Sequence, residues 1–259
     1  MRIMMDYRAK IRDYASIIDD LFEKYQDDPI PAAHRLDEAD CGKIEFARGC
    51  FMHRGFYCPS PIEEFVISNV RRGHLQKKRT ASSIYEYKFD RAGQLREAIQ
   101  PENPPYVETI WREGNFEIGL TATCILPMLR VVTLTEWNSY FPSFYCAADT
   151  GNSRWYEFFR FNGCELVEAH VFDVEDINRN KKIQEAVLRH CPNLTEIMEL
   201  VKALAVDGLA ITDHHYLRFD KNAGKCFVRC DSPLHRTSEW TVPYKGISSA
   251  FFQSHELGV

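Results

Sequence analysis

Residues 85–98 of the chain read YEYKFDRAGQLREA, in which aromatic and charged residues alternate before and after a turn at Gly93. Residues 156–169, YEFFRFNGCELVEA, repeat this order, with the same ten-residue step from the first tyrosine to the leucine. Alternation with a period of two is typical of a half-buried strand, and a glycine between two such runs predicts a β-hairpin. A looser third copy occupies residues 216–228. The chain is therefore expected to contain a sheet built from β-hairpins.

The equal spacing of the first two copies has two interpretations. One is an internal duplication, because similarity at a fixed order indicates a repeated unit. The other is independent convergence, since any hairpin needs alternating residues around a turn-forming glycine. Under both interpretations the aromatic residues and the leucine build the sheet, while the glutamates of the motif point away from them.

Further strand-rich segments lie between these two copies. Residues 109–123 turn at Gly114, and residues 129–137 are rich in β-branched side chains. Residues 41–57, interrupted by three glycines, fit another hairpin. Together these segments predict about six to nine strands joined by short turns, which is typical of an antiparallel meander.

Helical patterns occur at three places. Residues 7–25 carry apolar side chains at three- and four-residue intervals, which predicts a helix. Ser60-Pro61-Ile62-Glu63 has the chemistry of a helix start, with a capping serine, proline at the first position and an acidic residue near the positive end. A helix pair is predicted within residues 174–206, with apolar positions on both sides of Cys191-Pro192-Asn193.

These elements predict an α+β fold, in which an antiparallel, meander-like sheet carries N-terminal helices and an inserted helix pair packed on it. We expect a mainly helical N-terminal region over residues 1–78 and a hairpin-rich sheet over residues 79–259, with the helical insertion at 174–206. The chain has 259 residues, 45% of them hydrophobic, so one compact unit is expected.

Charge and cysteine content bear on partners and compartment. The formal net charge is −5, so the chain lacks the positive excess that non-specific nucleic-acid binding needs, and a protein partner of basic charge suits it better. Nine cysteines at irregular spacings favour a reducing compartment. The first residues are too charged for a signal peptide, and no run of about 18 apolar residues occurs. We expect a cytoplasmic protein without a membrane partner. The sequence does not indicate its oligomeric state.

Cys41, Cys50, His53 and Cys58 are the candidate metal ligands, because zinc prefers thiolate and imidazole. Their spacing contains no Cys-x2-Cys pair, and a strand over residues 50–58 would point His53 away from both of its cysteines. The alternatives are a zinc site and buried reduced thiols beside a surface histidine. No other cofactor is expected.

Two further motifs can be interpreted either as functional sites or as residues without a functional role. Asp213-His214-His215 resembles the tripeptide that names the DHH phosphoesterases, which implies metal binding, but the other aspartate motifs of that family are absent at matching positions. A basic run after the second predicted helix would contact phosphates or an acidic partner, or else form a solvated helix end. It comprises Arg71, Arg72, His74, Lys77, Lys78 and Arg79.

Residues 137–145, WNSYFPSFY, combine large aromatic side chains with Asn, Ser and Pro. This composition predicts a loop that carries binding anchors, because Trp and Tyr are frequent interface hot spots. A loop folded back on the sheet is the alternative. The predicted partner-binding residues are Trp137, Tyr140, Phe141, Phe144, Tyr145 and Trp155.

The sequence contains no nucleophile elbow, phosphate-binding glycine loop or dinucleotide motif, so it identifies no catalytic residues. The leading hypothesis is a non-catalytic protein-binding module, such as an immunity or inhibitor partner of a bacterial toxin, which needs surface complementarity instead of catalytic groups. The alternative is an enzyme or small-ligand binder with an aromatic-lined pocket and site residues scattered along the chain.

Overall fold

The computed structural model describes residues 2–50, 53–63, 71–100, 104–125, 127–179, 194–235 and 237–255, whose thirteen strands form one antiparallel sheet. The strands are β1 (Cys41–Arg48), β2 (His74–Gln76), β3 (Tyr85–Asp90), β4 (Leu95–Gln100), β5 (Tyr106–Glu113), β6 (Phe116–Thr123), β7 (Leu129–Asn138), β8 (Phe141–Asp149), β9 (Ser153–Asn162), β10 (Glu165–Asp176), β11 (Leu209–Asp220), β12 (Lys225–Asp231) and β13 (Ser238–Pro243). The α-helices are α1 (Arg2–Tyr25), α4 (Thr195–Leu204) and α5 (Ser249–Ser254), and short 3-10 helices occupy Ala32–His34, Glu38–Asp40 and Gly55–Tyr57.

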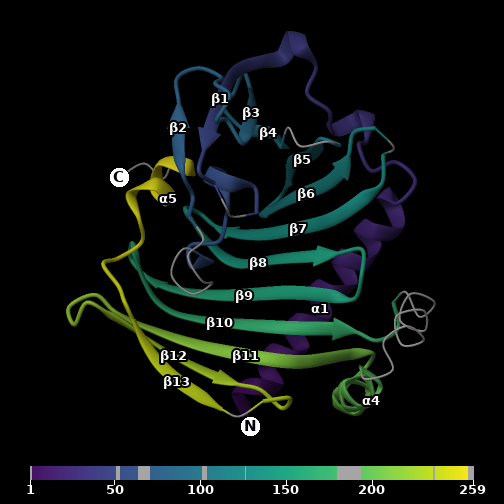
Figure 1. Ribbon diagram of the computed structural model, residues 1–259, viewed down its shortest axis with the longest axis vertical. Helices are drawn as coiled ribbons and strands as arrows, with labels where there is room; N and C mark the ends of the chain where they lie inside the picture. The colour runs from purple at the N-terminus through teal and green to yellow at the C-terminus, as the bar shows by residue number, and fades with distance from the viewer. Residues whose placement is uncertain are drawn as a thin grey trace.

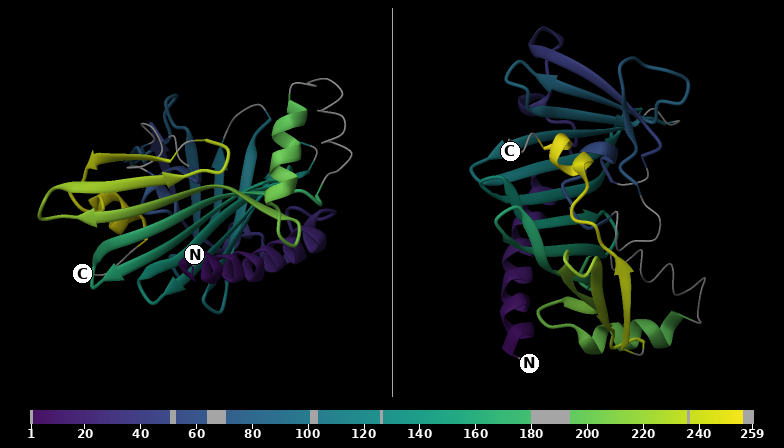
Figure 2. Two further views of the ribbon diagram at one scale, coloured as in Figure 1. Left: turned by 90° about the horizontal axis from the view of Figure 1, so that it is seen from below. Right: turned by 90° about the vertical axis from the view of Figure 1, so that its left-hand side faces the viewer.

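The sheet is a meander for most of its width (Figure 1). From β3 to β13 each strand lies beside the next one in the sequence and runs antiparallel to it, and β1 then lies between β3 and β2. The sheet is open, with β13 and β2 at its edges. Figure 2 shows the twist that accumulates across so many strands.

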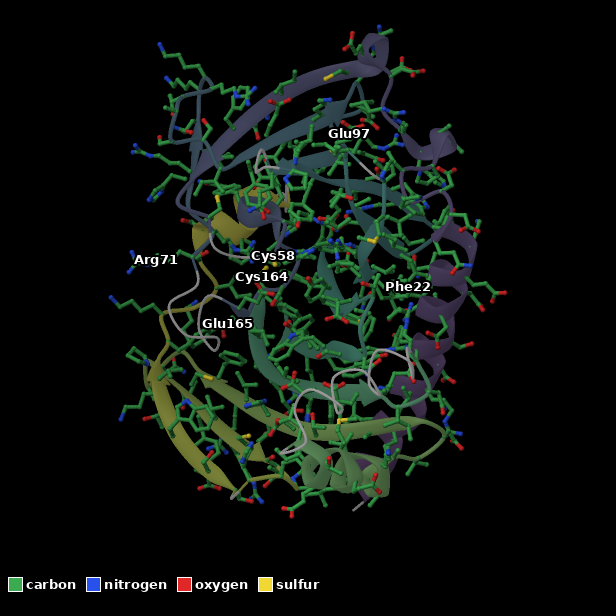
Figure 3. The ribbon with its side chains drawn as sticks, turned by 45° about the vertical axis from the view of Figure 1, so that its right-hand side comes forward. Phe22, Cys58, Arg71, Glu97, Cys164 and Glu165 are labelled. Carbon is green, nitrogen blue, oxygen red and sulfur yellow. The ribbon has the colours of Figure 1, made fainter. Side chains whose placement is uncertain are left out.

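The two faces of the sheet are covered by different parts of the chain. Helix α1 covers one side, called the helix face here, where Phe22 points toward the sheet (Figure 3) and belongs to the same cluster as Phe172. Residues 53–63 and α5 cover the other side, called the loop face, where Phe56 packs with Tyr87 of β3. Alternation along each strand supplies side chains to both faces, so both are buried over much of the sheet.

Helix α1 is attached by polar contacts as well as by apolar packing. The ring of Tyr14 stacks on Phe144 of β8, with centroids 3.6 Å apart, and its hydroxyl donates to Glu136 of β7 at 2.7 Å. The buried guanidinium of Arg154 on β9 donates to Asp19 of α1 at 2.7 Å. These contacts join one helix to three neighbouring strands.

The two copies of the repeated motif form hairpins of different register. In β3–β4, Ala98 lies opposite Tyr87. In β9–β10 the equivalent Ala169 lies opposite Phe159, one residue beyond Phe158, which is the equivalent of Tyr87. A slip of one residue turns a strand's side chains to the other face. Tyr87 accordingly packs on the loop face, whereas Phe158 packs against α1.

The turns account for this difference. In the first hairpin three residues, 91–93, separate Asp90 from its partner Gln94, whose carbonyl accepts from the Asp90 N–H. In the second hairpin only two residues separate the paired Asn162 and Glu165. Turn length sets hairpin register, so equal spacing in the sequence has produced unequal strand pairing.

The predicted antiparallel meander is confirmed, although strands dominate the chain and the α+β description fits it only loosely. The expectation of six to nine strands was too low, because β2, β8 and β13 were not recognised as strands. Residues 41–57 do not form a hairpin of their own, since β1 pairs with β2 and β3 instead. The region 1–78 therefore contributes two strands to the sheet as well as α1.

The helix predicted at residues 7–25 is present as α1, and the second helix of the predicted insertion is present as α4. Residues 174–176 are strand, because β10 continues to Asp176. The first helix of the predicted pair and most of the helix predicted after Ser60 lie outside the described residues. None of the described helices is both long enough and apolar enough to cross a membrane.

Candidate functional site

A buried arginine lies at the centre of the loop face. Arg54 adopts a positive φ of 57°, which is uncommon for a residue with a side chain. Its Nε and Nη2 donate to Glu108 Oε1 on β5 at 3.1 and 2.7 Å, and Nη1 donates to Glu117 on β6. Nη2 also donates to the Thr133 hydroxyl on β7 at 3.2 Å. Two carboxylates and a hydroxyl therefore neutralise and orient one buried cation.

The backbone of β6 makes room for this cluster at Gly119. A Cβ atom at this position would lie 2.1 Å from Glu108 Oε1, 2.4 Å from Thr133 Oγ1 and 2.9 Å from Arg54 Nη2. Glycine inside a strand often marks such a close approach of other groups. The charge cluster thus depends on the absence of a side chain on the central strand.

Electrostatics keep the cluster ionised. Burial by itself acts to raise the pKa of Glu108, but the positive charge of Arg54 and its hydrogen bonds outweigh burial, and the pKa of Glu108 is lowered. For Arg54, burial acts to lower the pKa, and the charges of Glu108 and Glu117 reverse the effect, so its pKa is raised. Each charge in the cluster is therefore stable only because the others are present.

A second buried carboxyl behaves differently. Glu157 on β9 accepts from the Ser60 hydroxyl at 2.7 Å and from Trp155 Nε1 at 2.5 Å. The Ser60 oxygen in turn accepts from the backbone N–H groups of Ile62 and Glu63 at 3.2 Å, as expected for a helix cap. Burial, followed by the charge of Glu63, raises the pKa of Glu157 to about 8, and burial raises that of Glu63 to about 7.

Arg72 holds the covering loop in place. Its side chain is almost completely buried and lies 5.0 Å from the ring centroid of Phe251 in α5. The guanidinium donates to three backbone carbonyls, those of Phe56, Cys58 and Ser60. The expectation of a solvated basic run is thus wrong for Arg72, whereas the exposed Arg71 points away from the molecule (Figure 3).

A cleft of about 480 Å³ opens beside the Arg54–Glu117 pair. Its walls come from β1, from the strands β3 to β7 and from α5. Trp137 and Tyr140, from the predicted aromatic segment, both line it. Its volume lies within the range of small-ligand pockets in proteins, roughly 300–1,000 Å³.

The charges of the cleft differ in how far they reach solvent. The side chains of Lys43 and Arg112 are 55% and 51% exposed, whereas those of Glu45 and Glu117 are 17% and 10% exposed. Glu45 accepts from Tyr57 and pairs with Lys43 at 2.6 Å. The carboxylate of Glu117 is therefore buried and that of Glu45 half-buried, and the more exposed cations form the part of the cleft that a ligand would meet first.

Trp137 forms an aromatic wall of this cleft. Its ring lies 5.3 Å from the Arg112 guanidinium and 5.1 Å from the ring of His255, the residue that follows α5. The side chain is 7% exposed, and its Nε1 has no hydrogen-bond partner among the described residues. An unpaired buried N–H group is costly, so this donor lowers the stability of the fold unless it finds an acceptor.

The other predicted partner-binding residues differ widely in exposure, because their segment is not a loop but the β7–β8 turn and β8 itself. Tyr140, in the turn, is 63% exposed. Phe141 stacks on Phe161 at 4.5 Å, and Trp155 is half-buried. Phe144 and Tyr145 are completely buried and have no surface with which to contact a partner.

The candidate zinc ligands are not gathered in the structure. Cys41 begins β1 and Cys50 follows its end, and a strand of eight residues is about 27 Å long. Among the described residues no three His, Cys, Asp or Glu side chains are grouped to hold a metal ion. Burial raises the pKa of Cys50 to about 11 and that of Cys58 (Figure 3) well above its usual value, so both thiols stay protonated.

The Asp213-His214-His215 motif is split between the two faces of the sheet, as strand alternation predicts. His214 lies on the helix face, where its Nε2 is 3.0 Å from Nδ1 of His170. Asp213 lies near Cys230, and His215 lies near Trp240. The three side chains therefore do not share a site.

Sequence reasoning missed the residues at the centre of the loop face, Arg54, Glu108, Glu117 and Gly119, and also the burial of Glu157. One available signal was the single acidic residue inside an apolar run, as at Glu108 within residues 106–111. A strand that is buried on both faces can keep such a residue only if it is paired.

No protein-family model, curated protein or solved structure gives a significant match to this chain.

Proposed function

We propose that the chain is a small-ligand-binding protein and that the cleft beside Arg54 binds a small organic anion with an aromatic or apolar body. The charge distribution of the cleft carries this proposal. Lys43 and Arg112 present cations to solvent, while the carboxylates of Glu45 and Glu117, with which they pair, are much less exposed. An incoming carboxylate or phosphate would therefore meet positive charge first.

The walls of the cleft suit the remainder of such a ligand. Trp137 and Tyr140 provide aromatic surface against which the body of the ligand can pack. A few fixed polar groups among aromatic side chains are the usual composition of a ligand site.

The Arg54 cluster supports the proposal because it holds charged residues of the cleft rigidly in place. Its hydrogen bonds hold Glu117 toward Arg54, with Arg112 3.4 Å away on the cleft side. Groups held in place before binding lose little freedom when the ligand arrives. The cluster itself binds no ligand in this proposal.

Phenylacetate and its neutral analogue phenylacetamide test the charge requirement. We expect phenylacetate to raise the unfolding temperature by mass action, by the equivalent of about 2.7 kcal/mol at 100 times its Kd, and phenylacetamide to raise it far less. Arg112→Gln should remove the effect of phenylacetate. Arg130→Gln, which changes another exposed arginine of the sheet outside the cleft, should retain it. Equal responses to the two compounds, or no response to either, would contradict the proposal.

A protein partner is the second candidate, in the sense of an immunity or inhibitor protein. It is favoured by two apolar side chains on the rim of the cleft, since Tyr140 is 63% and Leu75 39% exposed. Exposed aromatic residues beside a cleft are typical interface anchors.

Co-purification from the native host addresses this second candidate. We expect the wild-type chain to retain one specific partner at a fixed stoichiometry and Tyr140→Ala to lose it. The exposed Ile125, 65% accessible and outside the cleft, supplies the matched control Ile125→Ala, which should still retain the partner. Recovery of nothing above background with the wild-type chain would exclude this candidate.

A further inference from the structure

Two histidines and a carboxylate form a hydrogen-bonded chain on the helix face, away from the cleft. Nδ1 of His170 on β10 is 3.0 Å from Nε2 of His214 on β11. Nε2 of His170 is 3.3 Å from Glu168 Oε1, and the other oxygen of Glu168 accepts from Arg160 at 2.7 Å. Glu168, His170 and His214 are called the histidine chain below.

The protonation of the histidine chain follows from its contacts. The Arg160 hydrogen bond, as the main cause, lowers the pKa of Glu168, while burial lowers the pKa of His170 and lowers that of His214 to about 4. At neutral pH the carboxylate is thus ionised, and both imidazoles are neutral, with one donor and one acceptor each.

Only one arrangement of protons satisfies these contacts. A carboxylate accepts, so Nε2–H of His170 donates to Glu168, and Nδ1 of His170 must then accept from Nε2–H of His214. The lone pair on Nδ1 of His214 is the free end of the chain. The hydrogen bond to His170 is the one that the described residues make with His214, and it uses Nε2.

Aromatic packing holds both rings in position. Tyr7 of α1 packs on His170 with centroids 4.5 Å apart, and Phe172 stacks on His214 at 4.4 Å with 6° between the planes. His214 lines a groove of about 1060 Å³, which lies between α1, α4 and the strands β11 and β12. A fixed acceptor therefore borders a space large enough for a small molecule.

A second acceptor lies beside the first. Asp231 of β12 is directly opposite His214 in the strand register, and directly opposite residues share a face. Asp231, which also pairs with Arg229, lines the same groove together with Tyr7 and Tyr216. An ammonium group has three donors and no acceptor and is attracted to aromatic ring faces, so it suits this combination.

We propose that the groove binds a small primary amine, whose ammonium donates to Nδ1 of His214 and to the carboxylate of Asp231. The carbon body of the amine packs along Tyr7 and Leu204, which line the same groove. Glu168 and His170 are positioning residues, because they act by fixing the tautomer of His214.

The tautomer can be tested on the unaltered protein. Long-range nitrogen–proton correlation spectra at neutral pH should assign His214 to the Nε2–H form. Glu168→Gln, which replaces the obligatory acceptor by an amide, should reduce this preference. A wild-type His214 in the Nδ1–H form would overturn the proposal, since no lone pair would then face the groove.

Binding of phenethylamine and of its neutral analogue 2-phenylethanol is measured by titration calorimetry. We expect measurable binding of phenethylamine only, weakened at least tenfold in His214→Phe and in Asp231→Asn. His215→Phe changes the neighbouring histidine, which does not line the groove, and should bind as the wild type does. Equal binding of both compounds, no binding of either, or equal loss in His215→Phe would overturn the proposal. Asp231→Asn keeps the test valid should His214→Phe fail to fold.

Discussion

Arg54 and Glu108, separated by 54 positions in the sequence, form a buried ion pair in which two guanidinium nitrogens donate to one carboxylate oxygen at 3.1 and 2.7 Å. The pair joins the loop that covers the sheet to a strand at its centre. Glu117 and Thr133 also bind the same guanidinium. If the loop left the sheet, the buried charges of this cluster would therefore lose their partners.

Arg54→Ala is expected to destabilise the protein by about 3–5 kcal/mol, because it leaves two buried carboxylates without their cation. Urea unfolding followed by tryptophan fluorescence measures the change. Arg130→Ala, at an exposed position of β7, is the matched control and should change stability by less than about 0.5 kcal/mol. If both variants behaved alike, Arg54 would not be part of a buried cluster.

Gly119→Ala is expected to destabilise the protein by about 1–3 kcal/mol through overpacking, since the added Cβ would lie 2.1 Å from Glu108 Oε1. An alanine in place of glycine inside a strand is ordinarily favourable, so the direction of the change is informative. Gly151→Ala is the control, because its nearest neighbour is the movable carboxyl of Asp149. A stabilised Gly119→Ala variant would contradict the packing described for β6.

Glu157 should make stability depend on pH. Its pKa is about 8 in the folded protein and near 4.5 when unfolded, so as pH rises from about 5 to 8 the unfolded chain releases this proton first. The contribution of Glu157 is therefore present at pH 5 and is lost toward pH 8. Urea unfolding at both pH values should show a smaller loss in Glu157→Gln than in the wild type.

An exposed glutamate provides the control for this pH experiment. Glu165→Gln changes a side chain that is 54% exposed and paired only at the surface with Lys221. The free energy of unfolding of the Glu165→Gln variant should fall between pH 5 and pH 8 as much as that of the wild type. Parallel curves for Glu157→Gln and the wild type would show that Glu157 is not held protonated.

Phe144→Ala is expected to destabilise the protein by about 3–5 kcal/mol, because this side chain is completely buried and stacks on Tyr14 of α1. Tyr140→Ala, four residues away but mostly exposed, should change stability by less than about 0.5 kcal/mol. Thermal and urea unfolding measure both variants. Similar losses in the two would mean that the β7–β8 turn packs against the rest of the fold.

Part of the candidate site could be predicted. Trp137 and Tyr140 were chosen because they are large and aromatic, and both line the cleft. Their composition also suggested a loop, and this was wrong, because residues 141–149 pair with β7 and β9 as a central strand. Whether an aromatic side chain is an anchor or part of the core depends on which face it takes, and composition does not encode the face.

The sequence by itself determined the β-hairpins, because alternation and turn glycines act between neighbouring residues. It also determined the amphipathic helix α1, whose apolar positions recur at helical spacing. The tertiary structure alone decided which face each hairpin presents, since a turn of three residues at 91–93 and a turn of two at 163–164 shift equal motifs by one position. It also decided that Arg54 is buried, because the stability of that charge depends on Glu108 and Glu117, which are distant in the sequence and meet Arg54 only in the folded sheet.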